Sequence, residues 1–193
     1  MKNSLITLIA LLLLGCGSKD LQVKDALISI LNESTDKQEQ YKACILLAEL
    51  PADDELIDMI DGDNDQPNFC KTFLLAKYLG SQEAIDQFIS AFPSNNQLFT
   101  LFEKHSETGY IFGILPPAVK LLSEFARDDD QALDKLMGIL TTADGAHGES
   151  ITEVVADIYM RMPSRVELSF KRVKPSESDI LLIKKISEHK RNL

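Results

Sequence analysis

Apolar residues recur along most of this chain with the spacing of amphipathic α-helices. Three clear stripes cover residues 84–92, 132–140 and 151–162, where apolar side chains return every three or four positions. No stretch alternates apolar and polar residues with a period of two for long enough to predict a β-strand. The pattern therefore predicts an all-α fold in which each apolar stripe packs against another helix.

Helix boundaries are marked by residues with known end preferences. Gly80 is suited to a left-handed helix end, and Ser81 can cap the helix that follows. Residues 150–153 match a capping box, and residues 176–179 match a variant of one. Prolines that cannot continue the preceding helical patterns stand at Pro51, Pro93 and Pro163. These signals predict short helices joined as hairpins.

Four predicted hairpins share one plan, at residues 46–60, 74–89, 121–137 and 154–170. Their starts are 28, 47 and 33 residues apart, so the period is irregular. Over residues 36–173 the chain resembles a degenerate HEAT-like repeat array. That resemblance implies antiparallel helix hairpins stacked as a short α-solenoid, an architecture that mostly binds partners. An irregular helical bundle is the alternative architecture.

The N-terminal segment has the pattern of an export signal. Lys2 is followed by an apolar run over residues 5–14, which is too short to cross a bilayer core of about 30 Å as a helix. The run ends in Leu13-Leu14-Gly15-Cys16, which resembles the lipobox of bacterial lipoproteins. The resemblance implies cleavage between Gly15 and Cys16, with a thioether-linked diacylglycerol and an N-acyl chain on Cys16.

This lipoprotein resemblance also implies where the protein resides. Gly17, and not the Asp that retains lipoproteins at the inner membrane, follows the lipid-bearing cysteine. In a Gram-negative organism we therefore expect the outer membrane, facing the periplasm. The expected organisation is a signal peptide at 1–15, a lipid tether at 16–19 and one helical domain at 20–193. The tether reaches about 14 Å, which keeps the domain close to the bilayer.

Charge is distributed unevenly along the chain. Residues 16–160 hold 10 basic and 26 acidic side chains, whereas residues 161–193 hold 9 basic and 4 acidic ones. An acidic body repels the phosphate backbone, so nucleic acid is not expected as a partner. The basic clusters at 171–174, 184–185 and 190–191 are candidates for contact with lipid phosphates or an acidic partner. A solvated C-terminal helix is the simpler explanation and is favoured.

Two cysteines remain after lipidation, Cys44 and Cys70, on the first helices of two successive hairpins. An oxidising compartment permits a disulfide between them. Alignment of the hairpins places them about two positions out of register, so their separation could exceed the limit of about 7 Å between Cα atoms. A disulfide and two buried thiols both remain open on this reasoning.

Two further segments are candidate sites. Asp61, Asp63 and Asp65 resemble the start of a calcium loop, but Gln66 and Thr72 stand where that loop needs glycine and a bidentate glutamate. An acidic loop between helices is therefore favoured, and no metal is expected. The glycine-broken apolar segment around Tyr110, Ile111 and Phe112 could be an interaction segment, although a buried connector is the more common use of such a sequence.

The sequence contains no catalytic constellation. His105, His147 and His189 lie far apart, and neither a metalloprotease motif nor a nucleophile elbow is present. We therefore expect a non-enzymatic interaction module of the cell envelope, as an assembly accessory or an immunity-type binder. Its expected partners are the bilayer, through Cys16, and an envelope protein, with no cofactor beyond the covalent lipid. A small-ligand or ion carrier is the alternative, and an envelope hydrolase is the least favoured.

Overall fold

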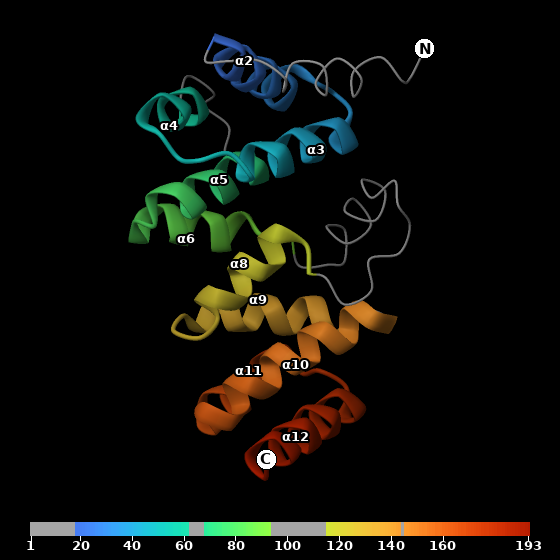
Figure 1. Ribbon diagram of the computed structural model, residues 1–193. Coiled ribbons are helices and arrows are strands. Elements are labelled where there is room, and N and C mark those ends of the chain that lie inside the picture. Colours follow the sequence, from blue (N-terminus) through green and yellow to red (C-terminus); the bar gives the residue numbers. More distant parts are fainter. Residues whose placement is uncertain (1–17, 62–67, 94–114, 144) are drawn as a thin grey trace. The chain divides into compact units, whose positions relative to one another are not determined.

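A computed structural model describes residues 18–61, 68–93, 115–143 and 145–193 (Figure 1). These residues form ten α-helices and no β-strand. The predicted all-α class is thereby confirmed. The chain divides into two compact units, of which the first ends at Ile85 and the second begins at Asp86. Each unit is described by itself.

The N-terminal unit contains α2 (Ser18–Glu33), α3 (Lys37–Ala48), α4 (Asp54–Asp61) and α5 (Phe69–Leu79). Here α3 packs between α2 and α5, and α4 packs against α5. The helices α3 and α5 bury consecutive residues, 43–45 and 72–76, so each is covered on more than one face. The most deeply buried large side chains of the core are Leu27, Leu47, Leu56 and Leu74.

Side-chain caps fix the starts of these helices, and a glycine ends one of them. Asp36 accepts a hydrogen bond from the backbone N–H of Gln38, and Asn68 accepts one from Cys70. Gly80 ends α5 in the left-handed conformation at φ 59°, as predicted. Ser81 then accepts from the N–H of Ala84 as α6 (Gln82–Ala91) begins, which confirms the predicted cap.

The end of α3 is held by α5. Lys77 and the Tyr78 hydroxyl donate to the backbone carbonyls of Ala48 and Leu47 in the last turn of α3. Carbonyls in the last turn of a helix lack the full set of intrahelical donors. The Leu47 carbonyl also accepts from the backbone N–H of Leu50 over 3.0 Å, and α5 adds the side-chain donors. Burial, followed by the nearby Cys44 and the acidic groups of Glu49 and Asp53, raises the pKa of Tyr78 to about 12. The contacts fix how α5 lies along α3.

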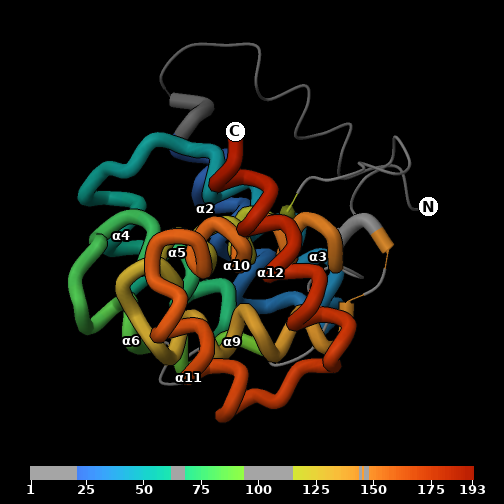
Figure 2. Tube along the Cα trace, turned by 90° about the horizontal axis from the view of Figure 1, so that it is seen from below, coloured from blue at the N-terminus to red at the C-terminus, as the bar shows by residue number. Residues whose placement is uncertain are grey.

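The C-terminal unit contains α8 (Pro117–Phe125), α9 (Asp130–Leu140), α10 (Gly145–Arg161), α11 (Pro163–Val173) and α12 (Glu177–Arg191). Within it α9 packs against α8 and α11. α10 packs against α11 and also against α12, which lies beside it in Figure 2. Each helix therefore contacts mainly the next one or two along the chain, as hairpins of a repeat array do. Whether the whole chain forms a solenoid stays a prediction.

The second half of α6 belongs to this unit. The Phe88 ring meets those of Phe92 and Phe125 edge to face, at centroid distances of 5.3 and 6.1 Å. Lys135 of α9 donates to the backbone carbonyl of Phe92 over 2.9 Å. Further along, the core is closed by the fully buried side chains of Leu133, Leu136, Val155, Val166 and Ile183.

Two predicted boundaries in this unit have different outcomes. Ser176 caps α12 by accepting from the backbone N–H of Asp179, which confirms the second capping variant. The capping box predicted at Ser150 is wrong, because α10 begins five residues earlier, at Gly145, and places Ser150 inside the helix. No helix in the described part of the chain is both long enough and apolar enough to cross a membrane.

Candidate interaction surface

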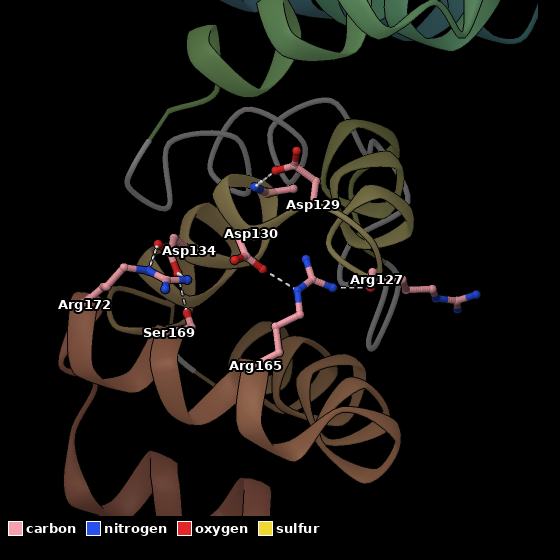
Figure 3. Close-up of polar contacts among 8 residues, drawn as sticks. Arg127, Asp129, Asp130, Asp134, Arg165, Ser169 and Arg172 are labelled. Carbon is pink, nitrogen blue, oxygen red and sulfur yellow. Dashed lines mark hydrogen bonds and ion pairs between the residues drawn. The ribbon is translucent and has the colours of Figure 1, made fainter.

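Two arginines of α11 hold aspartates of α9 (Figure 3). Arg165 donates to the carboxylate of Asp130 and to the backbone carbonyl of Arg127. Arg172 binds Asp134 through two bonds, with Nε–Oδ2 at 2.5 Å and Nη2–Oδ1 at 2.9 Å. The aspartates lie four residues apart and the arginines seven, so each pair occupies one helix face. The result is an ionic seam between α9 and α11.

This seam also includes a buried hydroxyl. Ser169, which is fully buried, donates to Oδ1 of Asp134 over 2.6 Å. The hydrogen bond from Arg165 lowers the pKa of Asp130, and the bond to Asp134 raises the pKa of Arg172. Asp134, Arg172 and Ser169 therefore satisfy one another's hydrogen-bonding groups in a fixed arrangement.

A second ionic cluster joins α12 to α10 and α11. Lys184 pairs with Glu167 at 2.7 Å, and the Tyr159 hydroxyl donates to the same carboxylate over 2.9 Å. The Tyr159 ring stacks on that of Phe170 at 6.2 Å, and Lys184 Nζ lies 5.9 and 6.0 Å from the two ring centres. The Lys184 ammonium lowers the pKa of Glu167, and Glu167 in turn raises the pKa of Lys184.

Near the end of α12, Lys190 pairs with Asp157 of α10 at 2.8 Å. Together with the seam, this contact shows that part of the positive charge of residues 161–193 is paired with carboxylates inside the unit. Four of its cations, Arg165, Arg172, Lys184 and Lys190, hold acidic partners. The sequence left open whether the opposite charges meet within the fold, and in this unit they do.

The remaining cations of α11 and α12 face solvent. These cations are Lys171, Lys185 and Arg191, together with Lys174 just after the end of α11. They make no hydrogen bond or ion pair with the residues that the structure describes. Their charge is therefore available to a partner.

The outer side of α12 is apolar as well as basic. Leu181 and Leu182 are 55% and 43% exposed, and Lys185 follows them one turn later. The opposite side carries Ile183 and Ser187, which are buried against the unit. We call Leu181, Leu182 and Lys185 the α12 outer face. Leu168 on α11 is exposed to a similar degree, 49%.

A local sequence signal marks this face. Residues 180–183 are four consecutive apolar positions, whereas one face of a helix accepts only about half of such a run. Two of the four side chains must therefore point outward wherever only one side of the helix is covered.

A cavity of about 210 Å³ lies elsewhere in the same unit. It is lined by Arg127, Asp128, Asp157, Ile158, Arg161 and Met162. The two arginines and two aspartates give its wall both signs of charge, and Lys190 already occupies the Asp157 carboxylate. The lining therefore favours no single class of ligand.

Comparison of the chain with protein-family models, curated proteins and solved structures found no match. Its function must be argued from its own residues.

Most residues singled out in the sequence lie outside the described part of the structure: Gly15, Cys16, Asp63, Asp65, Tyr110, Ile111 and Phe112. Asp61, the last residue of α4, is exposed. Lys71 donates to its backbone carbonyl over 2.9 Å and lies 3.9 Å from its carboxylate. Within the described ranges, no group of three or more potential ligands is arranged to hold a metal ion.

The structure brings the two predicted cysteine partners together. Cys44 of α3 and Cys70 of α5 are both buried and both carry free thiols. The Cys44 thiol donates to the backbone carbonyl of Cys70, with 3.9 Å between Sγ and oxygen. The offset of two positions in the aligned hairpins therefore does not separate them.

Proposed function

We propose that this protein is a lipid-anchored, non-enzymatic protein-binding module of the cell envelope. The observation that carries the proposal is the lipobox-like sequence ending at Cys16, placed directly before the first described helix. Because α2 begins at Ser18, only Gly17 separates the lipidated cysteine from it. The tether expected at 16–19 is thereby shortened to residues 16–17, which extend at most about 7 Å, so the N-terminal unit stays against the bilayer.

The α12 outer face is the surface we assign to the protein partner. Its two exposed leucines offer apolar contact, and Lys185 adds a positive charge one turn after Leu181. Further exposed cations stand elsewhere on α11 and α12 and in the connection between them, at 171, 174 and 191. Apolar side chains beside charged ones are the usual composition of a protein interface. The charge selects an envelope protein with an acidic surface around an apolar contact.

The lipid anchor is tested by metabolic labelling with an alkyne fatty acid. Wild-type protein should acquire the label and fractionate with membranes, whereas Cys16→Ala should acquire none and keep its signal segment. Wild-type protein that stays unlabelled, or that still begins at Met1 after purification, would refute the anchor.

The partner surface is tested by crosslinking the full-length anchored protein in cells. Leu181→Ser combined with Leu182→Ser should abolish the crosslink to one acidic protein, and Lys185→Glu should weaken it. Leu79→Ser is a matched control, because Leu79 is exposed to a similar extent, 49%, and lies in the other unit.

Two outcomes would contradict the protein-binding assignment. One is a crosslinked partner that both the double variant and the Leu79→Ser control retain equally. The other is binding of non-lipidated protein to vesicles of anionic phospholipid that depends on Leu181 and Leu182, because the face would then serve the bilayer and not a protein.

A further inference from the structure

Cys44 and Cys70 lie on two helices that pack directly against each other. Cys44 is in the middle of α3 and is fully buried, and Cys70 is in the first turn of α5 and is 6% exposed. The 3.9 Å contact from the Cys44 sulfur to the Cys70 carbonyl joins positions 26 residues apart in sequence. Both sulfurs therefore occupy one small region of the core of the N-terminal unit.

The same region holds a buried phenol. Tyr41, one turn before Cys44, is only 3% exposed, and its hydroxyl has no hydrogen-bond partner among the described residues. Burial, followed by the charges of Cys44 and Cys70, raises the pKa of Tyr41. Burial and then the Cys70 thiol likewise raise the pKa of Cys44. The Cys70 thiol is therefore close enough to affect the pKa of both Tyr41 and Cys44, and all three groups are shielded from water.

The approach of the two cysteines is fixed from a second point. At the far end of α5, Lys77 and Tyr78 donate to the last-turn carbonyls of α3. Two separated contacts between the same pair of helices set both their spacing and their relative shift along the axis. The two thiols are therefore kept adjacent by the fold, because helix packing and carbonyl capping hold them there.

We propose that Cys44 and Cys70 form a disulfide in the exported protein, which links α3 to α5 across the two hairpins. The inference rests on the proposed function only in placing the chain in an oxidising compartment. A thiol–disulfide oxidoreductase supplies the oxidant. One cysteine thiolate attacks the disulfide of the oxidoreductase, which forms a mixed disulfide and releases one oxidoreductase thiolate. The second cysteine thiolate then attacks the mixed disulfide at the sulfur of this chain, which breaks that bond, forms the S–S bond of this chain and releases the oxidoreductase as a dithiol.

The order of events follows from burial. Thiol–disulfide exchange needs a deprotonated cysteine that the oxidant can reach. Once α5 has packed on α3, both cysteines are buried and the raised pKa of Cys44 keeps that thiol protonated. The bond therefore forms before the N-terminal unit is complete. Afterwards the folded unit shields it, so that reductants act only on unfolded protein.

The test counts thiols in full-length protein purified from membranes without reductant. The protein is denatured and treated with a maleimide-linked polymer that adds one mass step for each free thiol. The chain has three cysteines, and the sulfur of a lipidated Cys16 is blocked as a thioether. We expect no added step, then two steps after reduction in denaturant, and one crosslinked peptide pair containing Cys44 and Cys70.

This count separates failure of the disulfide from failure of the anchor. Two steps before reduction would refute the disulfide while the anchor stands. One step, with the Cys44–Cys70 peptide pair intact, would refute the anchor while the disulfide stands. Three steps would refute both.

Thermal unfolding provides a matched control. Reduction in denaturant followed by refolding with reductant should lower the Tm of the wild type by about 10 °C, because the closed loop no longer restricts the unfolded chain. The double variant Cys44→Ala, Cys70→Ala should show the same Tm before and after this treatment. Reductant added to folded wild type should leave its Tm unchanged, and a prompt fall in Tm would refute the shielding.

Discussion

Lys174 ends α11 in a conformation that side chains disfavour. Its φ of 57° and ψ of 58° are left-handed, and among the described residues it is the only one with a side chain at positive φ. The same role at the end of α5 is taken by Gly80, which adopts it without steric cost. The chain therefore carries backbone strain at the turn between α11 and α12.

Lys174→Gly should raise the free energy of unfolding by about 0.5–1 kcal/mol, because relief of the left-handed strain exceeds the entropy that glycine adds to the unfolded chain. Lys174→Ala removes the same charge but keeps the strain, so it should give no gain. Urea denaturation of both variants measures the difference. An equal gain in both would mean that the charge, and not the backbone, is responsible.

Asp134 has the most demanding position in the ionic seam. It accepts from Arg172 twice and from the fully buried hydroxyl of Ser169. Asp134→Ala should lower the free energy of unfolding by about 1–2 kcal/mol, since the Ser169 hydroxyl loses its side-chain partner. In a Ser169→Ala background the same substitution should cost less. A double-mutant cycle measures this coupling, and strictly additive losses would contradict it.

At the scale of elements, α9 to α12 are joined by carboxylates that titrate below their usual range. Arg165 lowers the pKa of Asp130, and Lys184 lowers that of Glu167. A carboxylate whose pKa is lowered by folding adds stability above its unfolded pKa of about 4, and that stability is lost as pH falls through the folded value. The C-terminal unit should therefore lose stability progressively below about pH 4.

Asp130→Asn should flatten this acid dependence, measured as the free energy of unfolding between about pH 6 and pH 3. The change should stay below about 1 kcal/mol, because the Asp130 side chain is 58% exposed and solvent screens the pair. Asp128→Asn removes an equal charge two residues earlier, in the connection before α9, without breaking the contact to Arg165. A slope altered equally by both substitutions would rule out the ion pair as the cause.

Helix identity could be predicted from the sequence better than helix limits or helix partners. The ends at Gly80 and Ser176 were predictable because their capping chemistry is local. The start predicted at Ser150 was wrong because the residues of a capping motif are also tolerated inside a helix, and α10 extends upstream to Gly145. The contacts of Arg165 and Arg172 join residues 35 and 38 apart, and the irregular repeat period gives no rule for such a spacing.

At the scale of the whole molecule, the chain forms two compact units, and the boundary between them along the chain falls within α6. We expect them to respond separately to damage. Leu56→Ala, which empties a fully buried position in α4, should cost about 2–4 kcal/mol and speed amide exchange in α4 and α5 only. Asp134→Ala should speed exchange in α9 and α11 only. Hydrogen exchange read by mass spectrometry separates these patterns, and a uniform rise along the chain in either variant would indicate one cooperative unit.

The ionic contacts of the C-terminal unit have a consequence for its synthesis. Asp130, Asp134 and Asp157 precede the basic residues that hold them by 35, 38 and 33 positions. Translation therefore delivers the anions first and their counter-ions last. Until Arg165, Arg172 and Lys190 leave the ribosome, α9 and α10 belong to a nascent chain with an excess of negative charge, which repels itself. A product terminated before α11 lacks those counter-ions together with the two helices that pack on α9 and α10.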